Sequence, residues 1–248
     1  KAAMLMLLAA LAAALGLAAG AQWDPTIDPA CCAYPERDPR DFNWPYSHLL
    51  YAEVVPDVVG AFVALTELEL EYPDGARVSY GEHIAPAAAA NTPRVRFDLE
   101  PDRDGSSLHT LIAVDPDVPF RDTPTERERI LWLVYDIPGN VTASGRTLVP
   151  YAPPAPISCD EADNLCLPEH RITFLLFEQS VGPLHLEPED DAMGARFSGS
   201  ARRGEIRFKT RDFGARHSLG LPLAVNFFET AAAAGADDGN GGGRKDEL

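Results

Sequence analysis

The chain has 248 residues, a formal net charge of −17 and four cysteines. Such an acidic surface is repelled by nucleic acid and by anionic lipid head groups, so we expect neither as a partner. The length suits one well-buried domain of the larger all-β kind.

The first 21 residues have the pattern of a targeting segment. Lys1 precedes an apolar run beginning at Met4, and the small residues Ala19 and Ala21 form an A-x-A-like cleavage site before Gln22. We therefore predict a signal peptide over residues 1–21, with an uncleaved signal anchor as the alternative. No second apolar stretch is long enough to span a bilayer, so we expect no transmembrane segment in the mature chain.

The other end of the sequence, Lys245–Leu248, reads Lys-Asp-Glu-Leu, the address that returns proteins to the endoplasmic reticulum. It follows a glycine-rich, low-complexity stretch, and we expect residues 231–248 to be a flexible tail. Together the two ends predict residence in the lumen of the endoplasmic reticulum, with the KDEL receptor as a partner.

The four cysteines lie outside the apolar runs. An even number in an oxidising compartment predicts two disulfides among Cys31, Cys32, Cys159 and Cys166. One option is a local loop between Cys159 and Cys166. The other joins the N-terminal arm to the segment around these two residues by two cross-links.

The middle of the chain has the periodicity of strands. Residues 22–47 predict an irregular arm, and residues 48–230 a single domain. Alternating segments predict half-buried strands at Thr66–Tyr72 and Arg94–Glu100. Longer apolar runs predict central strands at Leu108–Val114, Ile130–Ile137 and Ile172–Phe177. A threonine in the N-cap position predicts one helix over Thr210–His217. The pattern predicts an all-β core with a few peripheral helices.

Five blocks of sequence, in their order along the chain, give a more specific prediction. They are Leu111–Arg121, which contains Asp115-Pro116-Asp117; Ile130–Gly139; Tyr151–Pro156; His170–Gln179; and Leu219–Phe228. In this order they resemble the phosphatidylethanolamine-binding protein family, over roughly Tyr51 to Glu229. The resemblance implies two packed antiparallel sheets with Greek-key connections and a small anion-accepting pocket at the strand ends. It also implies that the family's long C-terminal helix is shortened here.

The resemblance also implies which residues form the pocket. The residues that match the family are Asp115, Asp117, Pro153, Pro154, Pro156 and His170. Three positions have lost a donor, namely Leu131, Ile172 and Phe228, and Ala155 replaces a loop glycine. Because hydrogen bonds to charged groups contribute about 1.5–3 kcal/mol each, these losses predict weak phosphate binding. The remaining carboxylates then favour a cation or a more apolar ligand.

Asp115 and Asp117 also allow a purely structural interpretation. In that interpretation one carboxylate accepts hydrogen bonds from loop amides, and Arg121 pairs with the other. The segment Ile157–Glu169 is longer than the family's short link. It is interpreted either as a tolerated surface insertion or as a lid over the pocket rim.

The sequence contains no nucleophile–base motif, and its six histidines have no metal-ligand spacing. We therefore expect no enzyme activity, no metal and no cofactor. The first hypothesis is a lumenal binding protein for a small anionic or zwitterionic ligand, such as a phospholipid head group. The alternative is a regulator of a protein partner, for example a serine protease inhibitor. Asn140 begins an N-x-Thr acceptor and predicts a glycan.

Overall fold

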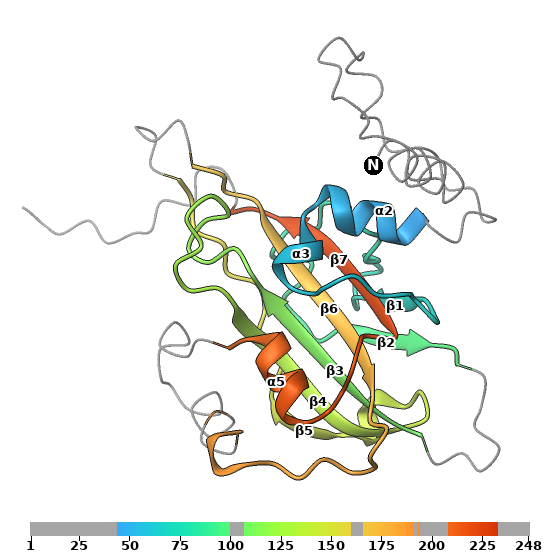
Figure 1. Cartoon of the computed structure of the whole chain (residues 1–248). Coiled ribbons are helices and arrows are strands. Elements are labelled where there is room, and N and C mark those ends of the chain that lie inside the picture. Colours follow the sequence, from blue (N-terminus) through green and yellow to red (C-terminus); the bar gives the residue numbers. More distant parts are fainter. Residues whose placement is uncertain (1–43, 100–106, 160–165, 191–192, 194–207, 233–248) are drawn as a thin grey trace, which may run out of the picture. The chain divides into compact units, whose positions relative to one another are not determined.

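The computed structural model describes residues 44–99, 107–159, 166–190, 193 and 208–232. All of these residues belong to one compact unit. Its centre is a five-stranded antiparallel sheet in the order β5-β4-β3-β6-β7 (Figure 1). The strands are β3 (Leu108–Asp115), β4 (Arg129–Pro138), β5 (Arg146–Val149), β6 (His170–Glu178) and β7 (Ala224–Thr230).

The three longest strands of this sheet are buried on both faces. In β3 every residue from His109 to Asp115 is buried, and β4 and β6 are nearly as closed. At the centre, Ile112 lies between Leu133 on β4 and Leu175 on β6. The apolar runs that predicted central strands are therefore confirmed. Runs without polar alternation are typical of strands covered from both sides.

Each face of the large sheet has its own cover. Ile112 and Val114 belong to an apolar cluster that includes residues of helices α2 (Trp44–Tyr51), α3 (Val54–Asp57) and α5 (Thr210–Arg216). Leu111 and Ala113 point to the opposite face because side chains alternate along a strand. They join a cluster with the two-stranded antiparallel sheet of β1 (Leu68–Glu71) and β2 (Arg94–Phe97).

This arrangement confirms the predicted class, an all-β core of two packed antiparallel sheets with few helices. The helix predicted over Thr210–His217 is α5, with His217 as its C-terminal cap residue. The predicted arm differs at its end, because α2 already begins at Trp44. Short elements without a long apolar period, such as β5 and the 3₁₀ helix η2 (Thr142–Ser144), were not predicted.

The small sheet is fixed to the large one through a buried amide. The Asn226 side chain donates to the backbone oxygens of Leu68 and Val78 at 2.8 and 3.1 Å. Its oxygen accepts the Tyr80 amide at 3.0 Å. One side chain of β7 thereby satisfies backbone groups of β1 and of the loop that follows it, which a buried backbone requires.

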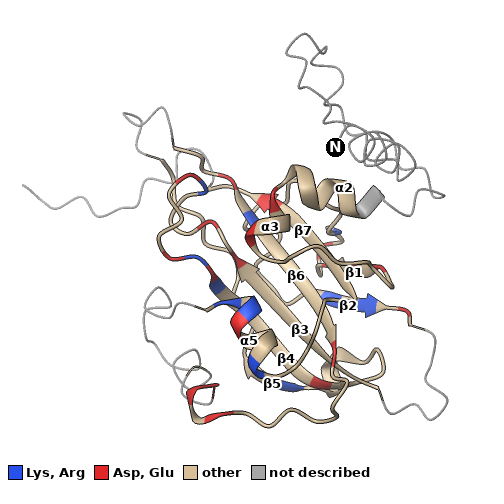
Figure 2. Ribbon diagram, in the orientation of Figure 1, with Lys and Arg blue, Asp and Glu red and all other residues tan. Residues whose placement is uncertain are grey.

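Charged residues are unevenly placed on the described surface. Figure 2 shows that acidic residues are spread over many loops and strands, whereas β2 carries basic residues. These are Arg94 and Arg96, both exposed, which alternate with buried Val95 and Phe97.

Candidate ligand-binding site

The predicted pocket residues gather at one end of the large sheet. In an antiparallel sheet the last residues of β3 and β7 lie beside the first residues of their neighbours. Asp115 is the last residue of β3 and His170 the first of β6. Phe228, near the end of β7, pairs with Ile172 on β6. Segments more than fifty residues apart in the sequence thus meet at this end.

Asp115 and His170 form a buried pair. The His170 Nδ1 atom lies 2.8 Å from Asp115 Oδ2, and both side chains are about 1% exposed. Nε2 of the same ring lies 3.0 Å from the Pro119 carbonyl oxygen. Burial lowers the pKa of His170, but the hydrogen bond from Asp115 and the charges of Asp115 and Asp117 outweigh it, so the pKa is raised.

Asp117 is held by a different partner, the fully buried Arg171. The guanidinium donates from Nε to Asp117 Oδ2 at 2.8 Å and from Nη2 to Oδ1 at 2.5 Å. The Arg171 backbone amide also donates to Oδ2, at 2.9 Å. Burial lowers the pKa of Arg171, yet Asp117 and then Asp57 raise it above its usual range. A forked pair with this geometry is typical of strong charge-assisted hydrogen bonds.

Two further groups close this cluster. Arg127 Nη2 lies 3.4 Å from Asp117 Oδ1, and Asp57 Oδ2 lies 2.8 Å from Arg171 Nη2. Three carboxylates therefore meet two arginines and His170, and their formal charges cancel when His170 is protonated. The suggestion that surplus carboxylate would attract a cation is not supported by this arrangement.

The expected partner of the aspartates, Arg121, lies elsewhere. It donates to Glu229 Oε1 at 3.2 Å and to the Ala52 carbonyl at 3.0 Å. That prediction is wrong because Arg171 reaches Asp117 from the neighbouring strand with better geometry. Asp115 does accept a loop amide, from Asp117 at 3.0 Å, as the structural interpretation expected.

The Pro-rich loop after β5 runs beside the beginning of β4. The Ala152 amide donates to the Leu131 carbonyl at 2.8 Å, and the Tyr151 hydroxyl donates to the Ala89 carbonyl at 2.7 Å. Burial raises the pKa of Tyr151 to about 12. Of the predicted loop residues, Pro154 is buried, Pro156 is half-buried, and Pro153 and Ala155 are exposed. The loop thus presents an exposed rim on a fixed base.

The three positions that lost a donor lie together in one apolar cluster. Leu131, Ile172 and Phe228 are 2%, 0% and 0% exposed and share that cluster with Phe174. The Phe228 ring stacks on Phe174, with 6.3 Å between centroids, and meets Tyr72 edge to face at 6.0 Å. The replacements therefore produce a buried apolar layer at the positions where the resemblance placed the family's phosphate donors.

The disulfide question is answered in part. Cys159 and Cys166 are bonded, with their Cα atoms 5.8 Å apart, so the local loop is the option that the structure contains. The insertion is also tied to the loop after β3, because the Leu167 amide donates to Asp122 Oδ1 at 3.4 Å. Cys31 and Cys32, the predicted signal peptide and the Lys-Asp-Glu-Leu end all lie outside the described residues. Asn140 is described and exposed, in the turn after β4.

Sequence reasoning missed Arg171, Arg127 and Asp57 as members of the charged cluster. Arg171 directly follows His170 in the block His170–Gln179, so its position in the sequence indicated that it lies close to the predicted pocket. Burial of an arginine at 0% exposure is exceptional, however, and only the paired carboxylates account for it. Arg127 and Asp57 stand in loop and helix segments with no distinguishing pattern.

Comparisons with known proteins give the family. The family model described as phosphatidylethanolamine-binding protein matches residues 69–228. The chain belongs to the phosphatidylethanolamine-binding protein family. It is 35% identical over 189 residues to CEN-like protein 1 of Nicotiana tabacum, covering 74% of this chain and 94% of that one. It is 32% identical over 199 residues to Protein FLOWERING LOCUS T of Arabidopsis thaliana, covering 79% and 95%.

Two solved structures show the same fold. The phosphatidylethanolamine-binding protein from Plasmodium vivax superposes with a TM-score of 0.55 at 20% identity, covering 75% of this chain and 96% of that one. The carboxypeptidase Y inhibitor, solved with its cognate proteinase, gives a TM-score of 0.56 at 20% identity, covering 75% and 94%.

Two features are absent from the residues that the structure describes. None of the helices in this part of the chain has the length and apolar character needed to cross a membrane. In the same residues no group of histidine, cysteine and carboxylate side chains is arranged to hold a metal ion.

Proposed function

We propose that this family member is a non-enzymatic binding protein of the endoplasmic reticulum lumen. Its ligand would be a small anionic or zwitterionic molecule, such as a phospholipid head group, held at the Pro-rich loop. The observation that carries the proposal is the gathering of Asp115, His170 and the loop of Pro153–Pro156 at one end of the sheet. Binding groups are commonly placed on loops that a rigid scaffold positions.

The chemistry of the site favours binding over catalysis. Both His170 ring nitrogens and both carboxylates of Asp115 and Asp117 have partners inside the protein. A general base needs a titratable group within reach of substrate, and these groups are fully buried. What faces solvent is the loop rim at Pro153 and Ala155, above an apolar layer. This arrangement of a solvent-exposed rim and an apolar layer suits an amphipathic ligand that places its polar group at the rim.

The proposed location depends on residues at both ends of the chain, with one supporting observation from the fold. The Cys159–Cys166 bond is of a kind that persists in oxidising compartments. The signal segment would deliver the chain there, and Lys245–Leu248 would return it from later compartments.

One observation favours the second function, regulation of a protein partner such as a serine protease. The bond between Cys159 and Cys166 is flanked by two aliphatic side chains, Ile157 and Leu167, which are 49% and 47% exposed. Apolar side chains beside a cross-linked loop are suited to contact a protein surface. A carboxypeptidase Y inhibitor shares the fold, but at 20% identity that likeness concerns the fold alone.

Native mass spectrometry of the full chain, recovered from the secretory pathway, distinguishes the two functions. A bound lipid mass, displaced by added phosphoethanolamine but not by ethanolamine, supports the head-group proposal. A stoichiometric protein partner lost in the double variant Ile157→Ser/Leu167→Ser supports the regulator. Recovery of neither species, together with no phosphoethanolamine binding by calorimetry, would contradict the head-group proposal.

A further inference from the structure

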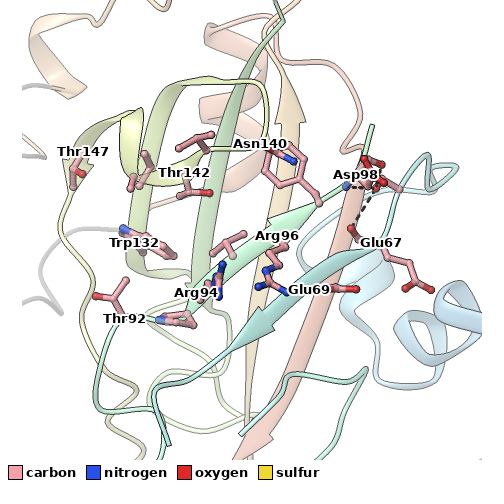
Figure 3. Close-up of a pocket in the computed structure, with 17 residues that line it drawn as sticks. Glu67, Glu69, Thr92, Arg94, Arg96, Asp98, Trp132, Asn140, Thr142 and Thr147 are labelled. Atoms are coloured by element: carbon pink, nitrogen blue, oxygen red, sulfur yellow. Dashed lines mark hydrogen bonds between the residues drawn. The ribbon is translucent and has the colours of Figure 1, made fainter. Parts of the chain in front are cut away.

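A second candidate site lies away from the Pro-rich loop. An open groove of about 1110 Å³ runs along β2, between the small sheet and the β4–β5 side of the large one (Figure 3). Seven consecutive residues, Thr92–Asp98, line one wall, so the groove follows β2 along its whole length. No residue of the site at the Pro-rich loop belongs to it. Its volume lies close to the upper end of the roughly 300–1,000 Å³ of ordinary small-molecule sites, and its extent along a whole strand suits an extended occupant.

The side of β2 that faces the groove is a free strand edge. Asp98 directs both its amide and its carbonyl toward Thr66, on the β1 side. Backbone groups alternate in direction along a strand, so those of Val95 and Phe97 point the other way, into the groove. Neither residue has a hydrogen-bond partner on that side among the described residues, although the two are only 9% and 3% exposed.

On the corresponding edge of β1 the carbonyl groups have partners. Leu68 and Leu70 pair with Phe97 and Val95 and therefore point their backbone groups away from β2. Their carbonyl oxygens accept from the Asn226 side chain at 2.8 Å and the Val78 amide at 3.0 Å. The β1 side of the small sheet is therefore bonded to other segments through its carbonyls, whereas the β2 side is open. An unpaired strand edge is a ready template for pairing with another chain.

The opposite side of the groove can receive the side chains of an added strand. Trp132 and Val134 of β4 form its base, and both belong to the apolar cluster between the sheets. Across from β2, Val141 on the rim is 52% exposed. Thr142 contributes a hydroxyl that is buried without a partner in the described part of the chain. Figure 3 shows Trp132, Thr142 and Asn140 across the groove from β2.

The outward face of β2 is basic in an otherwise acidic chain. Neither Arg94 nor Arg96 forms an ion pair with any residue that the structure describes. Glu69 stands opposite Arg96 in the register, yet the two are not bonded. Glu71, opposite Arg94, lies 3.8 Å from Arg77 instead. The groove lining also contains the carboxylates of Glu67, Glu69 and Asp98, but Glu67 and Glu69 stand on the β1 side of the small sheet and Asp98 follows the last residue of β2. A strand added at the free edge of β2 would therefore have Arg94 and Arg96 as its neighbours on the outward face.

We propose that an extended segment of a partner protein adds to β2 as a third, antiparallel strand. Its residues facing Val95 and Phe97 would be apolar and lie over Trp132, and those beside Arg94 and Arg96 would be acidic. This pattern follows because directly opposite residues in neighbouring strands point to the same face. A second copy of the chain does not suit the edge, since antiparallel self-pairing sets arginine against arginine.

A synthetic nonapeptide, Thr-Glu-Val-Glu-Val-Glu-Val-Glu-Thr with blocked ends, tests the proposal on the full chain. Binding is followed by fluorescence anisotropy, and amide exchange is followed by NMR. The peptide should slow exchange at the amides of Val95 and Phe97, and leave Arg94 and Arg96, which already face β1, unchanged. No binding at millimolar peptide, or protection elsewhere without change at Val95 and Phe97, overturns the proposal.

N-methylated peptides supply the matched control for backbone pairing. Methyl groups on the valine amides, which would face β2, should abolish binding. Methyl groups on the glutamate amides, which would face away, should leave it nearly unchanged. Equal behaviour of the two peptides excludes strand addition, and a loss confined to the glutamate-methylated peptide overturns the antiparallel arrangement.

Charge variants test the choice of partner. Arg94→Gln/Arg96→Gln should lower the affinity for the peptide by about tenfold. Arg77 is an exposed arginine on the far side of β1, and Arg77→Gln should leave the affinity unchanged. Arg94→Glu/Arg96→Glu should bind a peptide with lysine in place of glutamate better than the original. Unchanged preference in the charge-reversed variant overturns the acidic partner. The variants leave the Pro-rich loop intact, so the outcome is independent of the ligand proposed there.

Discussion

Both ring nitrogens of His170 face oxygen acceptors, Asp115 Oδ2 at 2.8 Å and the Pro119 carbonyl at 3.0 Å. Only a ring that carries two protons donates in both directions, and the raised pKa of His170 favours this protonated form beside the Asp115 carboxylate. This relationship fixes the loop after β3 to the first residue of β6. It also makes the strand end sensitive to pH.

We predict that the pair's contribution to the free energy of unfolding is lost as pH rises. The pKa of His170 is raised in the folded protein. The contribution is therefore fully present below the unfolded value of about 6.5 and disappears as pH rises through the higher folded value. Urea unfolding at intervals from pH 6 to 9 should show this slope. His170→Asn should flatten it, and replacing the exposed His185 by Asn should not. An unchanged slope in His170→Asn would assign the dependence to another group.

Arg171 should be the most sensitive side chain of the charged cluster. Replacement by alanine removes the fork from Asp117 and leaves its buried carboxylate with the backbone amide of residue 171 and the longer contact to Arg127. Breaking a buried pair in this way costs about 3–5 kcal/mol. Arg171→Lys should also destabilise, because an ammonium group cannot bond both oxygens in one plane.

Arg129, in a partly exposed pair with Glu126, is the control for this measurement. Arg129→Ala should cost about 0–1 kcal/mol in the same urea titration. If Arg171→Ala costs no more than this control, Asp117 is satisfied by other groups and the cluster does not stabilise the strand end.

The sequence predicts much of this fold because its patterns are local. The apolar runs at Leu108–Val114 and Ile130–Ile137 became β3 and β4 almost residue for residue. The position of Asp115 at a strand end, where Pro116 stops the pairing, follows from proline lacking an amide donor. Partners across the fold are not local. Arg171 is 54 residues from Asp117, and nothing near Arg121 indicated that it would turn toward Glu229 instead.

The free edge of β2 shows the same limit. Alternation at Arg94–Phe97 predicted a half-buried strand, and the structure has one. Which edge remains open depends on where Asn226 and Val78 bond to β1, and both are distant in the sequence from β2. Topology, rather than strand propensity, decides that the groove exists.

For the ligand site, we predict weak binding of phosphate and phosphoethanolamine, with affinity recovered by restoring donors. Leu131→His/Phe228→Tyr adds two polar groups to the apolar layer. Each new hydrogen bond to a charged ligand should tighten binding by about tenfold or more. Calorimetry measures the gain, with thermal unfolding alongside because both positions are buried. Val181→His, at an exposed position in the turn after β6, should have no effect. A folded double variant that binds no better would show that the pocket lies elsewhere.

We also predict a glycan on Asn140, which the structure places in an exposed turn. Protein from the cell of origin should lose mass on treatment with endoglycosidase H, because return from the Golgi limits further processing. Asn140→Gln and Thr142→Ala should each remove the modification, since both residues belong to the acceptor pattern. A peptide with wholly unmodified Asn140 in the native protein would contradict this prediction.

The proposed location is tested by deleting Lys245–Leu248. These residues lie beyond the last strand, β7, so the fold should be unchanged by the deletion. The truncated protein should be secreted, whereas the full chain should remain with lumenal chaperones, because the receptor recognises only the terminal four residues. Replacing Leu248 alone by valine-glycine should also cause secretion. An inert peptide tag inserted before Lys245 should leave the protein retained. Free thiols at Cys159 and Cys166 in a cytosolic full-length chain would contradict the lumenal location, and would favour a regulator of cytosolic proteins instead.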